Sequence, residues 1–597
     1  MSRTIRKPVK ACDQFAVTVF RSGKGGPCRF VILPVLGLAL LLSMPGCRIS
    51  APEDSGGEKN SAGSARELEL RLMNKSGAAA ENGRKTAASL RIGSMFRDHM
   101  VLQRNVPIRI TGSAARGSRV ELEFAGQKLT TRCGESGRWV FELKPKPASD
   151  RPLKLQISSG GERITIGDVL VGDVWLVSGQ SNMVCSADMK ISEYKARAGF
   201  YKEKASALRA KMAKIAEWNE PEIRFYTVGS GQWKKCVHRD AMACSLAAMF
   251  FARKLNRTLK IPVGLINTSF GCASIEAFLP LESLEQGGFP DLAAEGRAYQ
   301  KLLEQGGPSK LDRAGRNRLL LEHCRNPRYF FCKPYADRAG KVDPKKYRLI
   351  EWHMSVVKPG AVFLATVVKV LDFPIRGMLW YQGETNIYDN NYAAKQKLLA
   401  EAMRRLTKNP GLPFYAVMVA PSFTTTGLWA QQYAAAAGTP GTALVNTVDT
   451  PPDEQSDYHP STKDFIGERL ALAALNRAYG MKKIAYSGPV FEGIRHSGRS
   501  LLVSFRHAAG LQTKDGKVPL GFEIAGADRR FVPADARIEG GVIRVSAPAT
   551  ANPQYVRYAW SRSNNGVNVI NEAGLPLFPF DSSDPLFRSG KLKTMNE

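Results

Sequence analysis

Residues 174–183 read Val-Trp-Leu-Val-Ser-Gly-Gln-Ser-Asn-Met. The apolar run is typical of a buried strand, and a tight turn that contains glycine follows it. This turn is expected to expose Ser181 at the edge of a sheet, whereas Ser178 lies at the strand end, where its side chain should turn inward. A serine hydroxyl is a weak nucleophile at neutral pH, so catalysis would need a base and an oxyanion pocket elsewhere. An ordinary strand-ending turn rich in Gly, Ser and Asn explains the same residues without catalysis.

Three further apolar runs end in polar loops. Residues 263–272 read Val-Gly-Leu-Ile-Asn-Thr-Ser-Phe-Gly-Cys, and residues 377–386 read Gly-Met-Leu-Trp-Tyr-Gln-Gly-Glu-Thr-Asn. The run at 443–448 leads into Asp-Thr-Pro-Pro-Asp-Glu-Gln-Ser-Asp-Tyr-His-Pro at 449–460. In an open parallel sheet, the loops at the carboxyl ends of the strands meet at one crevice, where ligands bind. The four loops are therefore candidates for a single site.

The chain is long enough for two to four domains. Between 168 and 483, strands alternate with helices such as the one expected over 392–406, which predicts a parallel α/β sheet. The expected strands are 174–177, 223–226, 263–267, 377–381, 414–419 and 444–448. Two helical insertions, at about 187–219 and 284–350, follow the first two loops and should border the crevice. Residues 91–167 and 484–580 show period-two alternation and predict β-rich domains, the second packing either by itself or alongside the first.

The four loop motifs resemble those of a known family. Gly-Gln-Ser-Asn-Met, Ser-Phe-Gly, Trp-Tyr-Gln-Gly-Glu-Thr-Asn and Asp-Tyr-His-Pro occur in the same order in the sialate O-acetylesterases, which are SGNH (GDSL-like) hydrolases. Residues 98–104, 521–527 and 556–560 are also similar to that family, so the likeness covers roughly 93–580. It implies an SGNH-hydrolase (flavodoxin-like) parallel sheet core flanked by N- and C-terminal β-rich domains, in a bacterial exported member. The absence of Gly-x-Ser-x-Gly around Ser181 argues against the α/β-hydrolase elbow.

The resemblance assigns catalytic roles by position. Ser181 is the expected nucleophile, and His459 is the expected general base that takes the serine proton and returns it to the leaving group. Relatives often carry the acid three residues before the histidine, where this chain has Ser456. Asp457 is therefore the first candidate for the residue that orients the imidazole, and the further candidates are Asp453 and Asp449.

The family pattern also implies three oxyanion donors. These are the Ser181 amide, the Gly271 amide and a side-chain amide for which Gln382 is the match, with Asn386 and Asn182 as fallbacks. The position after Gly271 is commonly a second glycine in the family, but here it is Cys272. Glu384 either orients Gln382 or the histidine loop, or is a salt-bridged loop carboxylate.

The chain carries a net charge of +31, of which residues 1–47 contribute +6 (seven Lys or Arg and one Asp), leaving +25. The basic residues are scattered rather than gathered in a stripe with aromatics, so no nucleic-acid partner is expected.

The ten cysteines include no Cys-x-x-Cys pair. Cys236 with Cys244, and Cys324 with Cys332, are expected either as disulfides or as buried thiols. No short histidine spacing typical of zinc sites occurs, so neither a metal nor another cofactor is expected.

The N-terminus predicts export. A basic lead precedes the apolar stretch 30–44, which fits a secretory signal. The Met-Pro-Gly-Cys sequence that ends at Cys47 resembles a bacterial lipoprotein box, and the alternatives are an ordinary signal peptide or a membrane anchor. Residues 48–90 are expected to form a flexible linker, and 581–597 a tail. The protein is then expected in the periplasm or at the cell surface, with membrane attachment through lipidated Cys47.

These features predict a serine esterase that hydrolyses O-acetyl groups from carbohydrates through an acetyl-enzyme, without a cofactor. Two alternatives stay open. One is a non-catalytic glycan-binding protein on an esterase scaffold, which intact Ser181, Gln382 and His459 argue against. The other is an SGNH lipase or thioesterase, which should have an apolar lid near the crevice, whereas both insertions here are charged.

Overall fold

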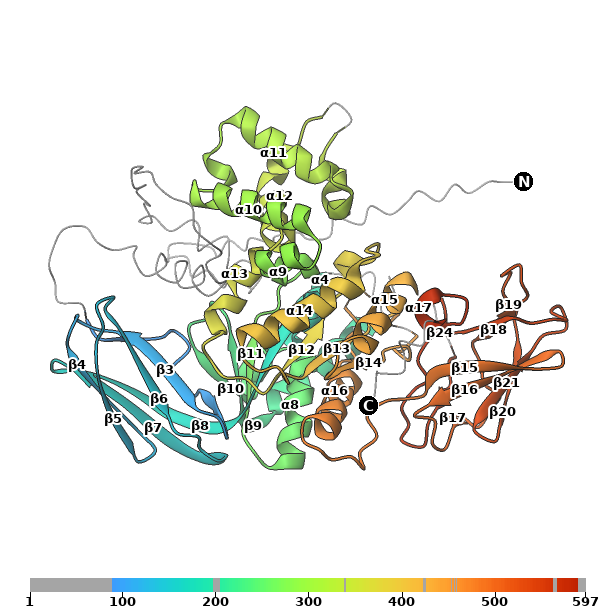
Figure 1. Cartoon of the computed structure of the whole chain (residues 1–597), viewed down its shortest axis with the longest axis horizontal. Helices are drawn as coiled ribbons and strands as arrows, with labels where there is room; N and C mark the ends of the chain where they lie inside the picture. Colours follow the sequence, from blue (N-terminus) through green and yellow to red (C-terminus); the bar gives the residue numbers. More distant parts are fainter. Residues whose placement is uncertain are drawn as a thin grey trace.

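The computed structural model describes residues 89–196, 204–337, 340–421, 426–452, 454–455, 457, 459–561 and 566–588. The predicted leader, Cys47, nearly all of the predicted linker and the residues beyond 588 lie outside this part of the chain. A central α/β unit carries a β-rich unit at each end of the long axis, and a group of helices projects from the centre (Figure 1). The two β-rich units are thus on opposite sides of the core, not side by side.

The N-terminal unit is built mainly from antiparallel strands, and in some of them every second side chain is buried. In β4 (Arg119–Phe124) and β6 (Arg138–Leu143) the alternation is complete, as period-two patterning predicts. The other strands of the unit are β1 (Arg91–Ile92), β2 (Val101–Gln103), β3 (Ile108–Ser113), β5 (Gln127–Arg132) and β7 (Ser149–Ser159).

One long strand joins this unit to the core. β8 (Glu162–Gly179) has 18 residues. Its first part pairs antiparallel with β7, and its last part pairs parallel with β11 (Val263–Asn267) and β12 (Gly377–Tyr381). The boundary predicted at 167/168 falls inside this strand. β8, which leads to Ser181, is therefore held by β7 in the N-terminal unit and by β11 and β12 in the central sheet.

The central sheet is parallel, as the alternation of strands and helices predicts. Its strands lie in the order β11, β8, β12, β13 (Phe414–Val417) and β14 (Thr442–Val445). A hairpin of β9 (Asn219–Thr227) and β10 (Trp233–Val237) lies beyond β11. β9 also pairs parallel with β11. Without β9, the other five parallel strands read 2-1-3-4-5 in chain order, a doubly wound arrangement whose topological switch point lies between the first and third of them, here β8 and β12.

Helices cover both faces of this sheet, which explains why its strands are continuous apolar runs. In β8, Trp175 and Val177 pack with α8 (Leu246–Leu259) and α16 (Asp464–Arg477) in one cluster. Val174 and Leu176 belong to a second cluster with α14 (Tyr392–Leu406) and α15 (Thr426–Ala437).

Both predicted insertions are helical. The first contains α4 (Ala187–Ala196) and α6 (Lys204–Ala213). The second forms the projection in Figure 1 from α9 (Leu281–Gln286), α10 (Pro290–Glu304), α11 (Arg313–Arg325), the 3-10 helix η5 (Pro327–Tyr335) and α12 (Tyr347–Val357). In the described part of the chain, no single helix has the length and apolarity to cross a membrane. The pair Pro344–Val357 and Ala361–Val370 meets those criteria only together, across an 89° bend.

The C-terminal unit holds two four-stranded antiparallel sheets and one two-stranded sheet. The first is β15 (Val490–Ser497), β16 (Ser500–Arg506), β21 (Val542–Ser546) and β20 (Asp535–Glu539). The second is β19 (Val532–Pro533), β18 (Phe522–Ala525), β22 (Tyr555–Tyr558) and β24 (Phe580–Asp581). The two-stranded sheet is β17 (Gln512–Thr513) with β23 (Val569–Ile570), and α17 (Pro585–Arg588) packs against α15.

Candidate active site

Ser181 is the first residue of the short helix α3 (Ser181–Val184), directly after β8. The turn between them depends on Gly179, whose φ is 135°, and a Cβ there would lie 2.2 Å from the Tyr381 carbonyl oxygen. Only glycine fits such a conformation at such a distance. Ser181 is half-buried, whereas Ser178 is fully buried. The turn thus exposes Ser181 and directs Ser178 inward, as expected.

Gly271 lies in the neighbouring loop after β11. The Phe270 N–H donates to the Gly179 carbonyl at 2.9 Å, which ties this loop to the serine turn. A Cβ on Gly271 would meet no atom within 4 Å, so open space adjoins the residue. Across the described ranges, neither the Ser181 N–H nor the Gly271 N–H donates to another protein group. Two backbone donors are therefore available near the serine, which an oxyanion requires.

Cys272 has a φ of +60°, in the left-handed region that favours glycine. The loop keeps the conformation that a glycine would adopt, and the Thr385 hydroxyl donates to the Cys272 carbonyl at 3.2 Å. Cys272 therefore holds a backbone conformation that glycine would adopt more easily, and the cost is local strain of about 1–2 kcal/mol.

We expect Cys272→Gly to change the free energy of unfolding by less than about 1 kcal/mol. The relief of left-handed strain and the greater unfolded-state entropy of glycine act in opposite directions. Cys272→Val should lower the free energy of unfolding by about 2 kcal/mol, because a β-branched side chain tolerates positive φ poorly. Urea unfolding of both variants measures this. Equal destabilisation by the two substitutions would show that the thiol's contacts, and not the backbone, set the preference.

Gln382 is completely buried after β12. Its Nε2 donates to the Ala273 carbonyl at 3.1 Å and to Asn386 Oδ1 at 2.7 Å, while its Oε1 accepts from the Tyr392 hydroxyl at 2.9 Å. Both amide hydrogens are thus directed at protein acceptors. This geometry does not favour the predicted role of Gln382 as the side-chain oxyanion donor. It makes Gln382 a link between the second and third loops.

Asn386, one of the two fallback donors, is also engaged within the protein. Its Nδ2 lies 3.1 Å from Glu276 Oε2 and 3.2 Å from Asp389 Oδ2, and its Oδ1 accepts from the Ile275 N–H at 3.0 Å. The Lys395 ammonium bonds both of these carboxylates. Asn386 therefore fixes the loops behind the site.

Asn182, the other fallback, adjoins the nucleophile and connects it to the remaining loops. Its Nδ2 donates to Glu384 Oε1 at 2.5 Å, and its Oδ1 accepts from the buried Lys463 ammonium at 2.7 Å. Burial raises the pKa of the Glu384 carboxyl, while the Asn182 hydrogen bond and the charges of Lys463 and His459 act in the opposite direction. Glu384 is therefore close enough to His459 for the two side chains to interact electrostatically. The predicted role of Glu384 in orienting the histidine loop requires this proximity.

The raised pKa of Glu384 predicts a pH-dependent cost to stability. The folded state holds this proton more tightly than the unfolded state, so the free energy of unfolding falls as pH rises above the ordinary glutamate pKa of about 4.3. Above the folded pKa the cost is constant. Glu384→Gln lacks this cost, so the variant should gain stability relative to wild type as pH increases, up to a plateau. Thermal unfolding across pH measures it, with the exposed Glu401→Gln as control. Parallel pH curves for wild type and Glu384→Gln would contradict the assignment.

His459 lies in the loop after β14, with 13% of its side chain exposed. Its Nδ1 is 3.5 Å from Glu193 Oε2 of α4. Asp457 contacts the same loop differently, because its Oδ1 accepts from the His459 backbone N–H at 3.0 Å and its Oδ2 from the Lys190 ammonium at 3.1 Å. The structure thus brings Glu193 to the imidazole, and the geometry favours Glu193 over the predicted Asp457 as the orienting acid.

Lys190 is completely buried and connects these groups. Its ammonium bonds Glu193 Oε2 at 2.9 Å and the His459 carbonyl at 2.6 Å, in addition to Asp457. Burial alone would raise the pKa of Glu193, but the contacts with His459 and Lys190 lower it below its ordinary value. Burial alone would likewise lower the pKa of Lys190, but Cys185 and the two carboxylates raise it. Both groups are therefore charged at neutral pH.

Asp449 and Asp453 were the further candidates for the residue that orients His459. Asp449 forms a two-pronged ion pair with Arg469, at 2.8 and 2.7 Å, and Asp453 lies outside the described residues. Sequence reasoning missed Lys190 and Glu193. The only signal for them was the prediction that the insertion 187–219 borders the crevice.

The cysteines in the described ranges are thiols rather than disulfides. Within both predicted pairs, Cys236 with Cys244 and Cys324 with Cys332, one thiol hydrogen bonds the other. Imidazole and thiol groups spaced for a metal ion occur away from Ser181, in the helical projection, at His323, Cys332 and His353.

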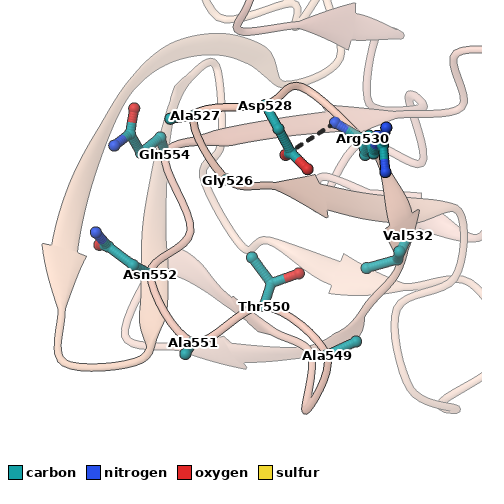
Figure 2. Close-up of a pocket in the computed structure, with 10 residues that line it drawn as sticks. All are labelled: Gly526, Ala527, Asp528, Arg530, Val532, Ala549, Thr550, Ala551, Asn552 and Gln554. Atoms are coloured by element: carbon teal, nitrogen blue, oxygen red, sulfur yellow. Dashed lines mark hydrogen bonds between the residues drawn. The ribbon is translucent and has the colours of Figure 1, made fainter.

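A depression of about 450 Å³ lies in the C-terminal unit, lined by loops around Asp528 and Thr550 (Figure 2). Its Asp528 accepts a hydrogen bond from the Arg530 N–H at 3.2 Å. None of its ten lining residues is a histidine, serine or cysteine, so they do not include a nucleophile with its base. The four loops around Ser181 are the better candidate for the active site.

Known proteins resemble this chain along most of its length. Residues 357–476 match the family described as "Carbohydrate esterase, sialic acid-specific acetylesterase". Sialate O-acetylesterase of Rattus norvegicus is 25% identical over 533 residues, covering 81% of this chain and 91% of the rat protein. The human sialate O-acetylesterase is 25% identical over 493 residues, covering 74% and 81%. A carbohydrate acetylesterase from Xanthomonas citri superimposes with a TM-score of 0.64 at 25% identity, covering 83% of this chain and all of that chain.

Proposed function

Because the chain belongs to the sialate O-acetylesterase family of carbohydrate esterases and is a carboxylic ester hydrolase, we propose that it removes O-acetyl groups from carbohydrates through an acetyl-serine intermediate. One observation carries the proposal. Ser181 begins a helix beside the loop of Gly271, and both N–H groups lack a protein acceptor in the described ranges. His459 lies in the loop after β14 of the same sheet, close enough to Glu384 for its charge to act on that carboxyl.

The first half of the reaction transfers the acetyl group to the enzyme. Ser181 Oγ attacks the acetyl carbonyl while His459 takes the hydroxyl proton, and the carbonyl oxygen becomes an oxyanion near the Ser181 and Gly271 N–H groups. The C–O bond to the sugar then breaks, and the imidazolium returns the proton to the sugar oxygen. The products of this half are a free sugar hydroxyl and acetyl-Ser181.

In the second half, His459 takes a proton from water as the water attacks acetyl-Ser181. Collapse of the second oxyanion breaks the bond to Ser181 Oγ, which regains the proton, and acetate leaves. Glu193 is the positioning residue for this cycle. Its contact with Nδ1 leaves Nε2 as the nitrogen that exchanges protons, and its charge stabilises the imidazolium. Asp457 and Lys190 hold the backbone of the histidine loop.

The core is of the SGNH-hydrolase type in this proposal. The 2-1-3-4-5 strand order supports it, because the loops of Ser181 and Glu384 then flank the switch point between β8 and β12. The basic lead, the apolar stretch and the box ending at Cys47 support action outside the cytoplasm on a lipid anchor.

Acetate release from O-acetylated sialic acids and from acetylated plant polysaccharides tests the proposal and separates the two glycan classes. Aryl acetate and aryl octanoate should be compared in parallel, because a lipase would favour the longer chain. We expect release from one glycan class and a preference for acetate. Failure of the folded protein to release acetate from any of these esters would contradict the proposal.

A further inference from the structure

A second group of reactive side chains lies inside the helical projection. His323 of α11, Cys332 of η5 and His353 of α12 are exposed by only 2%, 2% and 4%. One potential ligand atom from each lies within 4.8 Å of the other two. Three separate elements thus place two imidazoles and a thiol around one buried point.

The two imidazoles have unused hydrogen-bonding capacity. His323 Nε2 and His353 Nδ1 are 2.9 Å apart, so one donates to the other. Among the described residues, the second ring nitrogens, His323 Nδ1 and His353 Nε2, have no partner. A buried polar atom without a partner typically costs about 1–3 kcal/mol.

The ligand types of the cluster suit a cation. Two imidazoles and a thiol are groups that commonly bind zinc. Lys358 is the cationic side chain that acts on both imidazoles, and its ammonium is paired with Glu295 at 2.6 Å.

A second thiol is adjacent. Cys324 follows His323 in α11, is 1% exposed and shares a hydrogen bond with Cys332, but its sulfur is not among the atoms that all lie within 4.8 Å of one another. Imidazole nitrogen and thiolate sulfur are both usual zinc ligands. Tetrahedral zinc separates its ligand atoms by about 3.3–3.8 Å, given bonds of about 2.0–2.3 Å, which the 4.8 Å limit accommodates.

We propose that His323, Cys332 and His353 bind one zinc ion that ties α11, η5 and α12 together. The site is buried, as structural zinc sites are, and Cys324 can fill the fourth position only if its side chain moves toward the other three donors. Zinc binding would also affect the active-site loops through η5. The ring of Phe330 in η5 packs edge-on against the ring of Tyr388, with the two ring centroids 5.6 Å apart. Tyr388 follows the loop that contains Gln382 and Glu384.

Titration of the chelator-treated, reduced protein with Zn²⁺ and with Co²⁺ tests the site. We expect one ion per chain by elemental mass spectrometry, thiolate-to-cobalt charge-transfer absorption with Co²⁺, and a higher melting temperature with Zn²⁺. Cys332→Ala and His353→Gln should lose the cobalt spectrum. Cys236→Ala is the matched control, because the Cys236 thiol is also buried and hydrogen bonded to another cysteine thiol. This variant should keep the cobalt spectrum.

The cobalt spectrum of the wild-type protein does not depend on whether a variant folds. Absence of a bound ion in the folded wild type would overturn the proposal. A peptide map with Cys324 and Cys332 joined in a disulfide and no metal in the protein as purified would also overturn it, as would a cobalt spectrum retained by Cys332→Ala. Metal content and the cobalt spectrum are measured without acetate release, so these outcomes are distinguishable from failure of the proposed esterase function.

Discussion

Ser181→Ala is expected to lower kcat for acetate release by at least about 10⁴-fold while the protein keeps its fold. The reason is that the hydroxyl supplies the only covalent bond to the acetyl group in the proposed cycle, and removal of a catalytic serine has effects of this size or larger. The methyl group fits the half-buried first position of α3 without disturbing Gly179. Acetate release under saturating substrate measures the change.

His459→Ala should lower kcat for acetate release by about as much as Ser181→Ala does. The double variant should have a kcat no lower than that of either single variant. Groups that act as one unit lose their joint contribution when either is removed. Thermal unfolding is the control, because Ser181→Ala should melt close to wild type. If Ser181→Ala kept most of its activity, or if the two losses multiplied in the double variant, the shared mechanism would be wrong.

The junctions that position Ser181, Gly271 and Gln382 could be predicted from sequence because each combines two local signals. An apolar run marks a strand buried on both faces, and the glycine or polar residue that follows marks its end. Parallel pairing then brings the ends together, as the registers of β11 and β12 with β8 show. The half-buried Ser181 and the fully buried Ser178 follow from the same turn.

The acid could not be predicted in this way. Glu193 lies in a Lys- and Ala-rich helix without a motif, and the contact of Lys190 with Asp457 spans 267 residues. Asp457 lies two residues before His459, not three as in relatives, and at that spacing its carboxylate accepts from the His459 backbone N–H. Gln382 illustrates the same limit, because sequence identifies an amide but not the acceptors that its hydrogens will meet.

The metal-type cluster escaped prediction for a related reason. Short histidine spacings detect ligands that share one helix or hairpin. His323 and His353 are 30 residues apart and meet only because α11 and α12 pack in the projection. Spacing rules are therefore silent about sites assembled by tertiary contacts.

Glu193→Gln is expected to lower kcat by about 10²–10⁴-fold with little change in KM. Glutamine keeps the size of the side chain but not the charge that stabilises the imidazolium, and loss of the orienting carboxylate in a serine triad has effects at the upper end of this range. Asp457→Asn should reduce kcat less than about 10-fold, because its Oδ1 still accepts from the His459 backbone N–H. Glu193→Asp should restore part of the loss.

Stability provides a readout for Glu193 that is independent of activity. Its lowered pKa means that the folded state releases this proton more readily than the unfolded state, so its contribution is present above the ordinary glutamate pKa of about 4.3 and is lost as pH falls. Wild type should therefore exceed Glu193→Gln in melting temperature at pH 7, and the difference should shrink on acidification. A larger kcat loss in Asp457→Asn than in Glu193→Gln would return the orienting role to Asp457. A melting difference that stays the same as the pH falls from about 4 to about 2, well below the ordinary glutamate pKa of about 4.3, would show that Glu193 is not held as a carboxylate by His459 and Lys190.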